Sequence, residues 1–131
     1  MFPKNTKIIA VDFDGTIVED AYPKIGKPLP FAFETLKELQ AKGHRLILWT
    51  YRSGEKLEEA VAFCKKNGID FYAVNKSYPE EIPDNNISRK IHADVFIDDR
   101  NFGGMQSWTF IYEDLLKKKT LKKKKKKWYN F

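Results

Sequence analysis

Short apolar runs alternate with longer amphipathic stretches over the first 116 residues of the chain. The apolar runs cover residues 8–11, 45–50, 71–74 and 93–97, and polar or turn-forming residues bound each of them. Runs of this length with such boundaries are typical of buried strands. The pattern therefore predicts four strands.

Helical spacing of apolar residues fills two of the gaps between these runs and follows the last one. Phe33, Leu36 and Leu39 mark a helix that starts near Pro30 and ends at Gly43. A second helix is predicted from Ser53, as a cap, to residue 66, and a third from residue 108 to about 116. Strands that alternate with helices through short loops predict an α/β fold, with a parallel sheet and helices on both of its faces.

Acidic and polar residues directly follow three of the predicted strands. Asp12 and Asp14 follow the first, Thr50 ends the second, and Asp98 and Asp99 follow the fourth. Ligands bind beyond the carboxyl ends of the strands in parallel sheets. We therefore expect these side chains to converge at one edge of the sheet.

Such a set of side chains can bind a cation and an anion together. Carboxylates that converge repel one another unless a cation such as Mg²⁺ neutralises them. Thr50, Arg52 and either Lys90 or Lys76 add donors for an anion. Metal-binding acids beside anion donors are typical of phosphoryl transfer, in which one Asp can act as nucleophile and another as general acid.

The segment Asp12-Phe13-Asp14-Gly15-Thr16 resembles the first motif of the haloacid dehalogenase (HAD) superfamily of phosphohydrolases. Thr50, Lys90 and Asp98-Asp99 resemble the second, third and fourth motifs, and they occur in the family order between residue 7 and about residue 104. This resemblance implies a three-layer α/β/α, Rossmann-like parallel sheet. The connections after the first motif and after the third strand are short, so the chain resembles the type without a cap domain, whose site is open.

The resemblance also implies roles for the acidic residues. Asp12 would be the nucleophile and Asp14 the general acid and base. The Asp12 side chain, the Asp14 backbone carbonyl and Asp98 would hold Mg²⁺, with Asp99 as an additional or outer ligand. The implied activity is Mg²⁺-dependent hydrolysis of a phosphomonoester through an aspartyl-phosphate. A phosphotransferase or phosphomutase would share this intermediate and differ only in the acceptor.

Phosphate binding falls, by the same resemblance, to Thr50 and Lys90, with Lys90 also contacting Asp12. Arg52 resembles a substrate or phosphate ligand of some members. Lys76, which follows the third predicted strand, is the alternative to Lys90 if the alignment of the third motif slips. The substrate is either a small phosphorylated molecule or a larger one such as a nucleic-acid end.

Charge divides the chain into a body, residues 1–116, and a C-terminal tail, residues 117–131. The formal net charge is +6, yet nine of the 24 basic residues are lysines between Lys117 and Lys127, and the remaining 15 face 18 acids. The tail could bind nucleic acid or an anionic surface, so a nucleic-acid-binding protein that acts through this tail is the alternative function.

The single cysteine excludes an internal disulfide, and no run of about 18 apolar residues that could span a membrane is present. The N-terminus also lacks the apolar segment of a signal peptide. These features predict a cytoplasmic protein.

Overall fold

The computed structural model describes residues 5–82 and 90–117. It contains four strands and three helices in the order β1 (Ile8–Val11), α1 (Ala32–Ala41), β2 (Arg45–Leu48), α2 (Gly54–Lys66), β3 (Ala73–Val74), β4 (Val95–Ile97) and α3 (Trp108–Leu116). None of the described helices is long and apolar enough to span a membrane.

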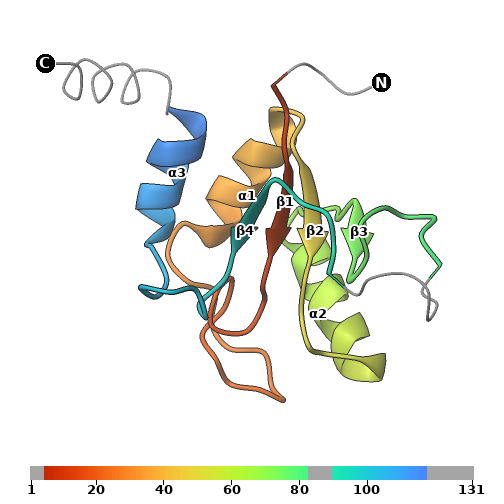
Figure 1. Ribbon diagram of the computed structural model, residues 1–131. Helices are drawn as coiled ribbons and strands as arrows, with labels where there is room; N and C mark the ends of the chain where they lie inside the picture. The colour runs from red at the N-terminus through yellow and green to blue at the C-terminus, as the bar shows by residue number, and fades with distance from the viewer. Residues whose placement is uncertain (1–4, 83–89, 118–131) are drawn as a thin grey trace, which may run out of the picture.

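The four strands form one parallel sheet in the order β3-β2-β1-β4 (Figure 1). All three strand pairs are parallel, and β1 lies between β2 and β4, with Val11 opposite both Leu48 and Ile97. The predicted α/β class and the parallel, Rossmann-like sheet are confirmed. Among the described residues no further domain is inserted after β1 or after β3.

Alternation along the strands separates two apolar clusters, one on each face of the sheet. Ile9 and Val11 of β1 and Leu46 and Leu48 of β2 face the larger cluster, to which all three helices contribute. The other face carries a smaller cluster: Ala10, Ile47, Ala73 and Ile91. No helix residue belongs to it.

The prediction of helices on both faces thus differs from the described structure, in which all three helices lie on one face. The reason is the strand order. The chain moves across the sheet in one direction from β1 to β2 and then to β3, through α1 and α2. Right-handed crossovers therefore place both helices on the same face. Only the β3–β4 connection crosses back. Its residues 75–82 and 90–94 contain no helix, and residues 83–89 lie outside the described part of the chain.

The helix ends show how local sequence sets the boundaries. Gly43 follows α1 with a φ of +94°, a backbone conformation that suits glycine at a helix end. Ser107 caps α3, because its hydroxyl oxygen accepts a hydrogen bond from the Phe110 N–H at 3.1 Å. Ser53 occupies the predicted cap position of α2, but its side chain makes no capping hydrogen bond.

The connection between β1 and α1 folds back on itself below the carboxyl ends of the strands (Figure 1). The Glu19 N–H donates to the Lys27 carbonyl at 2.7 Å, and the Leu29 N–H donates to the Ile17 carbonyl at 2.8 Å. These bonds make residues 17–29 a hairpin-like loop. Its tip brings further side chains to the edge of the sheet where the acids lie.

The core cluster that joins α1 to the sheet generates the first prediction. Leu36 is fully buried in it, whereas Lys37 in the same helix is exposed. Replacing Leu36 with Ala should lower the free energy of unfolding by about 2–5 kcal/mol, because the cavity would be only partly filled by relaxation. In urea denaturation Lys37→Ala, the control, should change it by less than about 0.5 kcal/mol. Equal effects of the two variants would contradict this account of the core.

Candidate functional site

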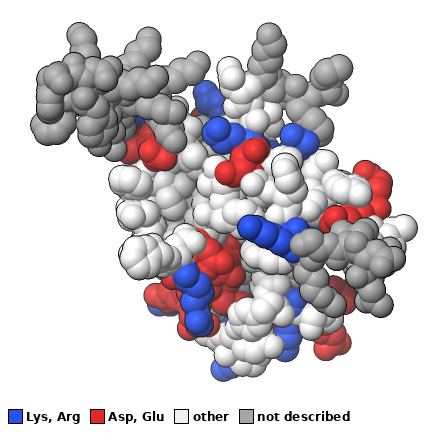
Figure 2. All heavy atoms as spheres, viewed as in Figure 1, with Lys and Arg blue, Asp and Glu red and all other residues white. Residues whose placement is uncertain are grey.

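Three carboxylates meet just beyond the carboxyl ends of β1 and β4. Val11 and Ile97 are paired across the two strands, so the next residues, Asp12 and Asp98, leave the sheet side by side. The Asp12 N–H donates to the Ile97 carbonyl at 2.9 Å and continues the pairing by one step. Asp12, Asp98 and Asp99 each offer a carboxylate oxygen, and these oxygens lie within 4.8 Å of one another. Figure 2 shows acidic atoms gathered on this side of the molecule.

Gly15 allows Asp99 to approach the loop after β1. Its φ is +85°, and a Cβ built on it would overlap the Asp99 carboxylate. Both the backbone conformation and the contact therefore require glycine here. Gly15 thus does more than form a turn with Asp14, because it makes room for the Asp99 carboxylate.

Thr16 holds the acidic group together. Its side chain is buried, and its hydroxyl donates to Asp12 Oδ2 at 2.9 Å while it accepts from the Asp99 N–H at 3.0 Å. Its backbone carbonyl accepts a hydrogen bond of 2.7 Å from the indole N–H of Trp108, at the start of α3. The sequence places Thr16 in the first motif, but nothing in its spacing predicts that it links both acidic segments.

Burial and like charge raise the pKa of Asp12 to about 7. The largest cause is desolvation, which opposes the charged form, and the negative charges of Asp98 and Asp99 add to it; the hydrogen bond from Thr16 acts in the opposite direction. Burial also raises the pKa of Asp98, with the neighbouring Asp99 as a further cause. A cation bound here would remove both the desolvation cost and the repulsion.

Asp14 forms a buried, bidentate ion pair with Arg52. The Arg52 Nε–H donates to Asp14 Oδ2 and one of its Nη2–H groups to Asp14 Oδ1, both at 2.7 Å. The other N–H groups of Arg52 donate to the backbone carbonyls of Pro23, Lys24 and Lys56. The side chains of Asp14 and Arg52 are 2% and 0% exposed.

This arrangement corrects the prediction that Arg52 is a substrate or phosphate ligand. A guanidinium group has five N–H donors, and here all five are used within the chain. Arg52 instead positions Asp14. The resemblance of Arg52 to a phosphate ligand rests on its distance from Thr50 in the sequence, which says nothing of where the guanidinium group points.

An open hollow of about 440 Å³ lies over the acids. Thr50 lines it, its N–H donates to Asn75 Oδ1 at 2.8 Å, and its hydroxyl accepts from the Arg52 N–H at 3.2 Å. The hydroxyl hydrogen of Thr50 therefore remains available for an anion. Described residues that line the hollow are Asp12, Asp14, Asp20, Trp49, Thr50, Tyr51, Asp98, Asp99 and Arg100. Neither Asp20 nor Arg100 belongs to a motif or follows a strand in a way that marks it as a site residue in the sequence.

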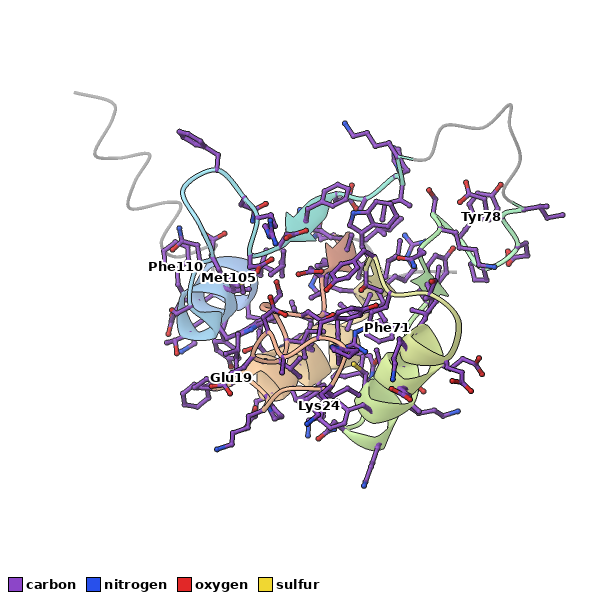
Figure 3. The ribbon with its side chains drawn as sticks, turned by 90° about the horizontal axis from the view of Figure 1, so that it is seen from below. Glu19, Lys24, Phe71, Tyr78, Met105 and Phe110 are labelled. Carbon is purple, nitrogen blue, oxygen red and sulfur yellow. The ribbon has the colours of Figure 1, made fainter. Side chains whose placement is uncertain are left out.

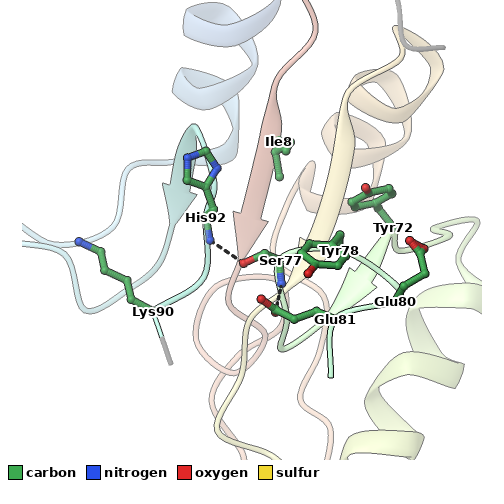
Figure 4. Close-up of a pocket in the computed structure, with 8 residues that line it drawn as sticks. All are labelled: Ile8, Tyr72, Ser77, Tyr78, Glu80, Glu81, Lys90 and His92. Atoms are coloured by element: carbon green, nitrogen blue, oxygen red, sulfur yellow. Dashed lines mark hydrogen bonds between the residues drawn. The ribbon is translucent and has the colours of Figure 1, made fainter. Parts of the chain in front are cut away.

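Neither Lys90 nor Lys76 lines this hollow. Lys90 lines a different one, of about 660 Å³, which also includes Tyr72, Tyr78 and His92. In Figure 4 its side chain extends away from the two tyrosines. The contact of Lys90 with Asp12 stays a prediction from the sequence. The segment that carries Lys90 follows residues 83–89, which lie outside the described chain.

The lysine run lies almost entirely outside the described residues, since only Lys117 is included. Lys117 is exposed and pairs with Glu113 of α3 at 3.8 Å. The predicted binding of nucleic acid or an anionic surface by residues 117–127 stays a prediction from the sequence.

A solved structure of the conserved protein coded by a locus from Bacteroides thetaiotaomicron is similar to this chain. The two chains are 58% identical, the match covers 87% of this chain and 93% of the other, and the TM-score is 0.81. The chain belongs to the family of this Bacteroides protein. No family model and no curated protein matches the sequence. Membership of the Bacteroides family supports the fold, and the chemistry has to be argued from the site itself.

The buried pair of Asp14 and Arg52 generates the second prediction. Arg52→Met leaves the Asp14 carboxylate buried without its cation, which should lower the free energy of unfolding by about 3–5 kcal/mol in urea denaturation. The matched control is Lys56→Met, because Lys56 forms an exposed ion pair with Glu59 at 3.7 Å. This control should cost less than about 1 kcal/mol. If the unpaired charge causes the loss, the double variant Arg52→Met/Asp14→Asn should recover part of it.

Asp12 generates the third prediction, for protein kept free of metal with EDTA. Because the pKa of Asp12 is about 7 in the folded protein and near 3.8 ordinarily, the folded state binds more protons than the unfolded state between these values. Stability from this group is therefore lost as the pH rises through 7. At pH 8, Asp12→Asn should be more stable than the parent by an amount on the order of a few kcal/mol.

The gain in the free energy of unfolding of Asp12→Asn over the parent should shrink as the pH falls toward 4, because the Asp12 carboxyl of the folded parent is then protonated. Thermal or urea unfolding at pH 4 to 8 measures it, with the exposed Asp70→Asn as control. A gain that does not depend on pH would contradict the electrostatic cause.

Proposed function

We propose that this protein is a Mg²⁺-dependent phosphomonoester hydrolase with Asp12 as its nucleophile. The observation that carries the proposal is the convergence of Asp12, Asp98 and Asp99, whose carboxylate oxygens lie within 4.8 Å of one another beneath an open hollow. Thr50 lines the same hollow, as the resemblance to the HAD superfamily implies.

The donor set fits Mg²⁺. Carboxylate oxygens are the ligands that this hard cation prefers, and the raised pKa of Asp12 reflects first desolvation and then repulsion, both of which a cation relieves. When bound, Mg²⁺ would offset the repulsion between the Asp12 carboxylate and a phosphate dianion and would neutralise charge on the transferring group. Asp12, Asp98 and Asp99 would hold it, and the Asp14 carbonyl stays a further ligand implied by the resemblance.

Asp12 would attack phosphorus with a carboxylate oxygen. The bond between phosphorus and the leaving oxygen would break, an Asp14 carboxyl that starts the cycle protonated would give that oxygen its proton, and an aspartyl-phosphate would form. Asp14 then takes a proton from a water molecule that attacks the phosphorus, which releases phosphate and regenerates the Asp12 carboxylate. Thr50 would donate its hydroxyl hydrogen to a phosphoryl oxygen.

Arg52 would control how Asp14 performs its part. Each carboxylate oxygen has two lone pairs, and Arg52 uses one on each. The remaining lone pairs are those through which Asp14 would exchange a proton with the leaving group or with water. Arg52 is a positioning residue in this scheme.

A phosphotransferase or phosphomutase would use the same residues up to the aspartyl-phosphate and would differ only in the acceptor. The open hollow gives water access, which favours hydrolysis. A nucleic-acid-binding function through the tail has support from the sequence alone.

Hydrolysis of 4-nitrophenyl phosphate with Mg²⁺ and with EDTA tests the proposal, which is the fourth prediction. Turnover should require Mg²⁺ and should fall by at least about 10³-fold in Asp12→Asn, because the nucleophile is removed. Asp70→Asn, the control, removes an exposed acid that does not line the hollow and should keep parent activity. The proposal is wrong if Asp12→Asn keeps its activity, or if the parent neither hydrolyses phosphate esters nor binds Mg²⁺ in calorimetry.

A further inference from the structure

Tyr51 at the acidic hollow lies against Tyr22, and we call this pair of exposed tyrosines the rim of the hollow. Tyr51 directly follows Thr50, lines the hollow and is 66% exposed, and Tyr22 in the hairpin-like loop is 46% exposed. Their ring centroids lie 5.1 Å apart with the planes tilted by 54°. They come from different connections, one after β1 and the other after β2, yet they meet at this place.

The buried ion pair holds one of these rings in position. The Arg52 guanidinium lies 5.1 Å from the centroid of the Tyr22 ring and 5.1 Å from that of Phe13, which is buried below. The Arg52 side chain is itself held in one conformation, because it donates hydrogen bonds to Asp14 and to the backbone carbonyls of Pro23 and Lys24 beside Tyr22. A ring fixed before binding loses little conformational entropy when a ligand stacks on it.

The charge of the hollow restricts what can stack there. Arg52 neutralises Asp14, which leaves Asp12, Asp20, Asp98 and Asp99 with Arg100 as the one basic residue among the described lining. A divalent cation and Arg100 together do not outweigh four carboxylates. A phosphoryl group adds more negative charge, so further anionic groups on the ligand would be repelled.

We propose that Tyr22 and Tyr51 bind the leaving group of the substrate, and that this substrate is a phosphomonoester with a planar ring and no further negative charge. The inference rests on the proposed phosphatase function and specifies its substrate class. Aromatic faces stack on planar rings with a preference over puckered ones of the same size. A nucleic-acid end, with its chain of phosphates, is disfavoured at this rim.

A matched pair of esters tests the inference, as the fifth prediction. Benzyl phosphate and cyclohexylmethyl phosphate both have a primary alcohol as the leaving group. The two alcohols differ in whether their ring is planar. The parent should prefer the benzyl ester in kcat/KM by about fivefold. Tyr51→Leu and Tyr22→Leu should bring this ratio toward one, whereas Tyr51→Phe should keep it because the ring is retained.

Tyr78→Leu is the control, because Tyr78 is similarly exposed, at 45%, but lines the other hollow. Viewed from the carboxyl ends of the strands, Tyr78 lies on the β3 side, on the opposite side of the molecule from Met105 and Phe110 (Figure 3). Its loss should leave the ratio unchanged. A carboxylate added at the para position of benzyl phosphate should lower kcat/KM, and added salt should weaken this discrimination.

The outcomes separate this inference from the function on which it rests. Asp12-dependent turnover with the same ester ratio in the parent and Tyr51→Leu would overturn the ring-binding surface and leave the phosphatase standing. If neither ester is hydrolysed, the phosphatase fails only when Mg²⁺ binding is absent as well, and calorimetry with Mg²⁺ and benzylphosphonate then decides the ring-binding surface alone. Binding that is lost in Tyr51→Leu would support it, and binding that is absent or equal in both proteins would overturn it.

Discussion

The rest of the site depends on the cost of holding three carboxylates together at the end of a buried sheet, a cost that comes first from desolvation and then from mutual repulsion. The parallel register of β1 and β4 places Asp12 beside Asp98, and Asp99 approaches over Gly15. The surroundings of these acids offset only part of the cost. Thr16 supplies a hydrogen bond to Asp12, yet desolvation still raises the pKa of that group to about 7. A fold that maintains such an arrangement favours a ligand that removes the remaining cost, and a hard cation does so most directly.

Asp14, two residues after Asp12, has the opposite environment, because a cation pairs with its charge. Asp14 is as deeply buried as Asp12, but Arg52 neutralises it through two short hydrogen bonds. Two carboxylates from one short segment therefore have different environments, one that discourages the charge and one that supports it. Without a bound cation this difference is the reverse of the proposed roles, because Asp12 has to act as a carboxylate and Asp14 has to give a proton. The proposed function therefore depends on a bound cation that keeps Asp12 ionised. Arg52 also supports Tyr22, so its guanidinium group links Asp14 to the rim of the hollow.

Much of the fold could be predicted, because its elements depend on local patterns. The predicted third helix coincides with α3, and the run at residues 8–11 is β1. The convergence of Asp12, Asp98 and Asp99 could also be predicted, because parallel strands place their carboxyl ends at one edge. The direction in which a long side chain points could not be predicted from the sequence. Arg52 turns to Asp14, and Lys90 lines another hollow, although both lie near the site in the motif order. Tyr22 has no motif at all, and only the folding of the loop brings it to Tyr51.

Local charge, and not the total, decides what the hollow accepts. The chain carries a formal charge of +6, yet the charged residues among the described lining of the hollow are five aspartates and one arginine. Exposed charges act over about 8 Å at physiological salt, so a lysine offsets an aspartate of the site only where the two lie closer than that. α3 runs back from the carboxyl edge of the sheet, so the C-terminal end of this helix lies toward the opposite edge (Figure 1). The basic character that whole-chain composition suggests thus does not apply to the described lining of this hollow, and under the proposed function the acids and tyrosines around Asp12 would set its selectivity.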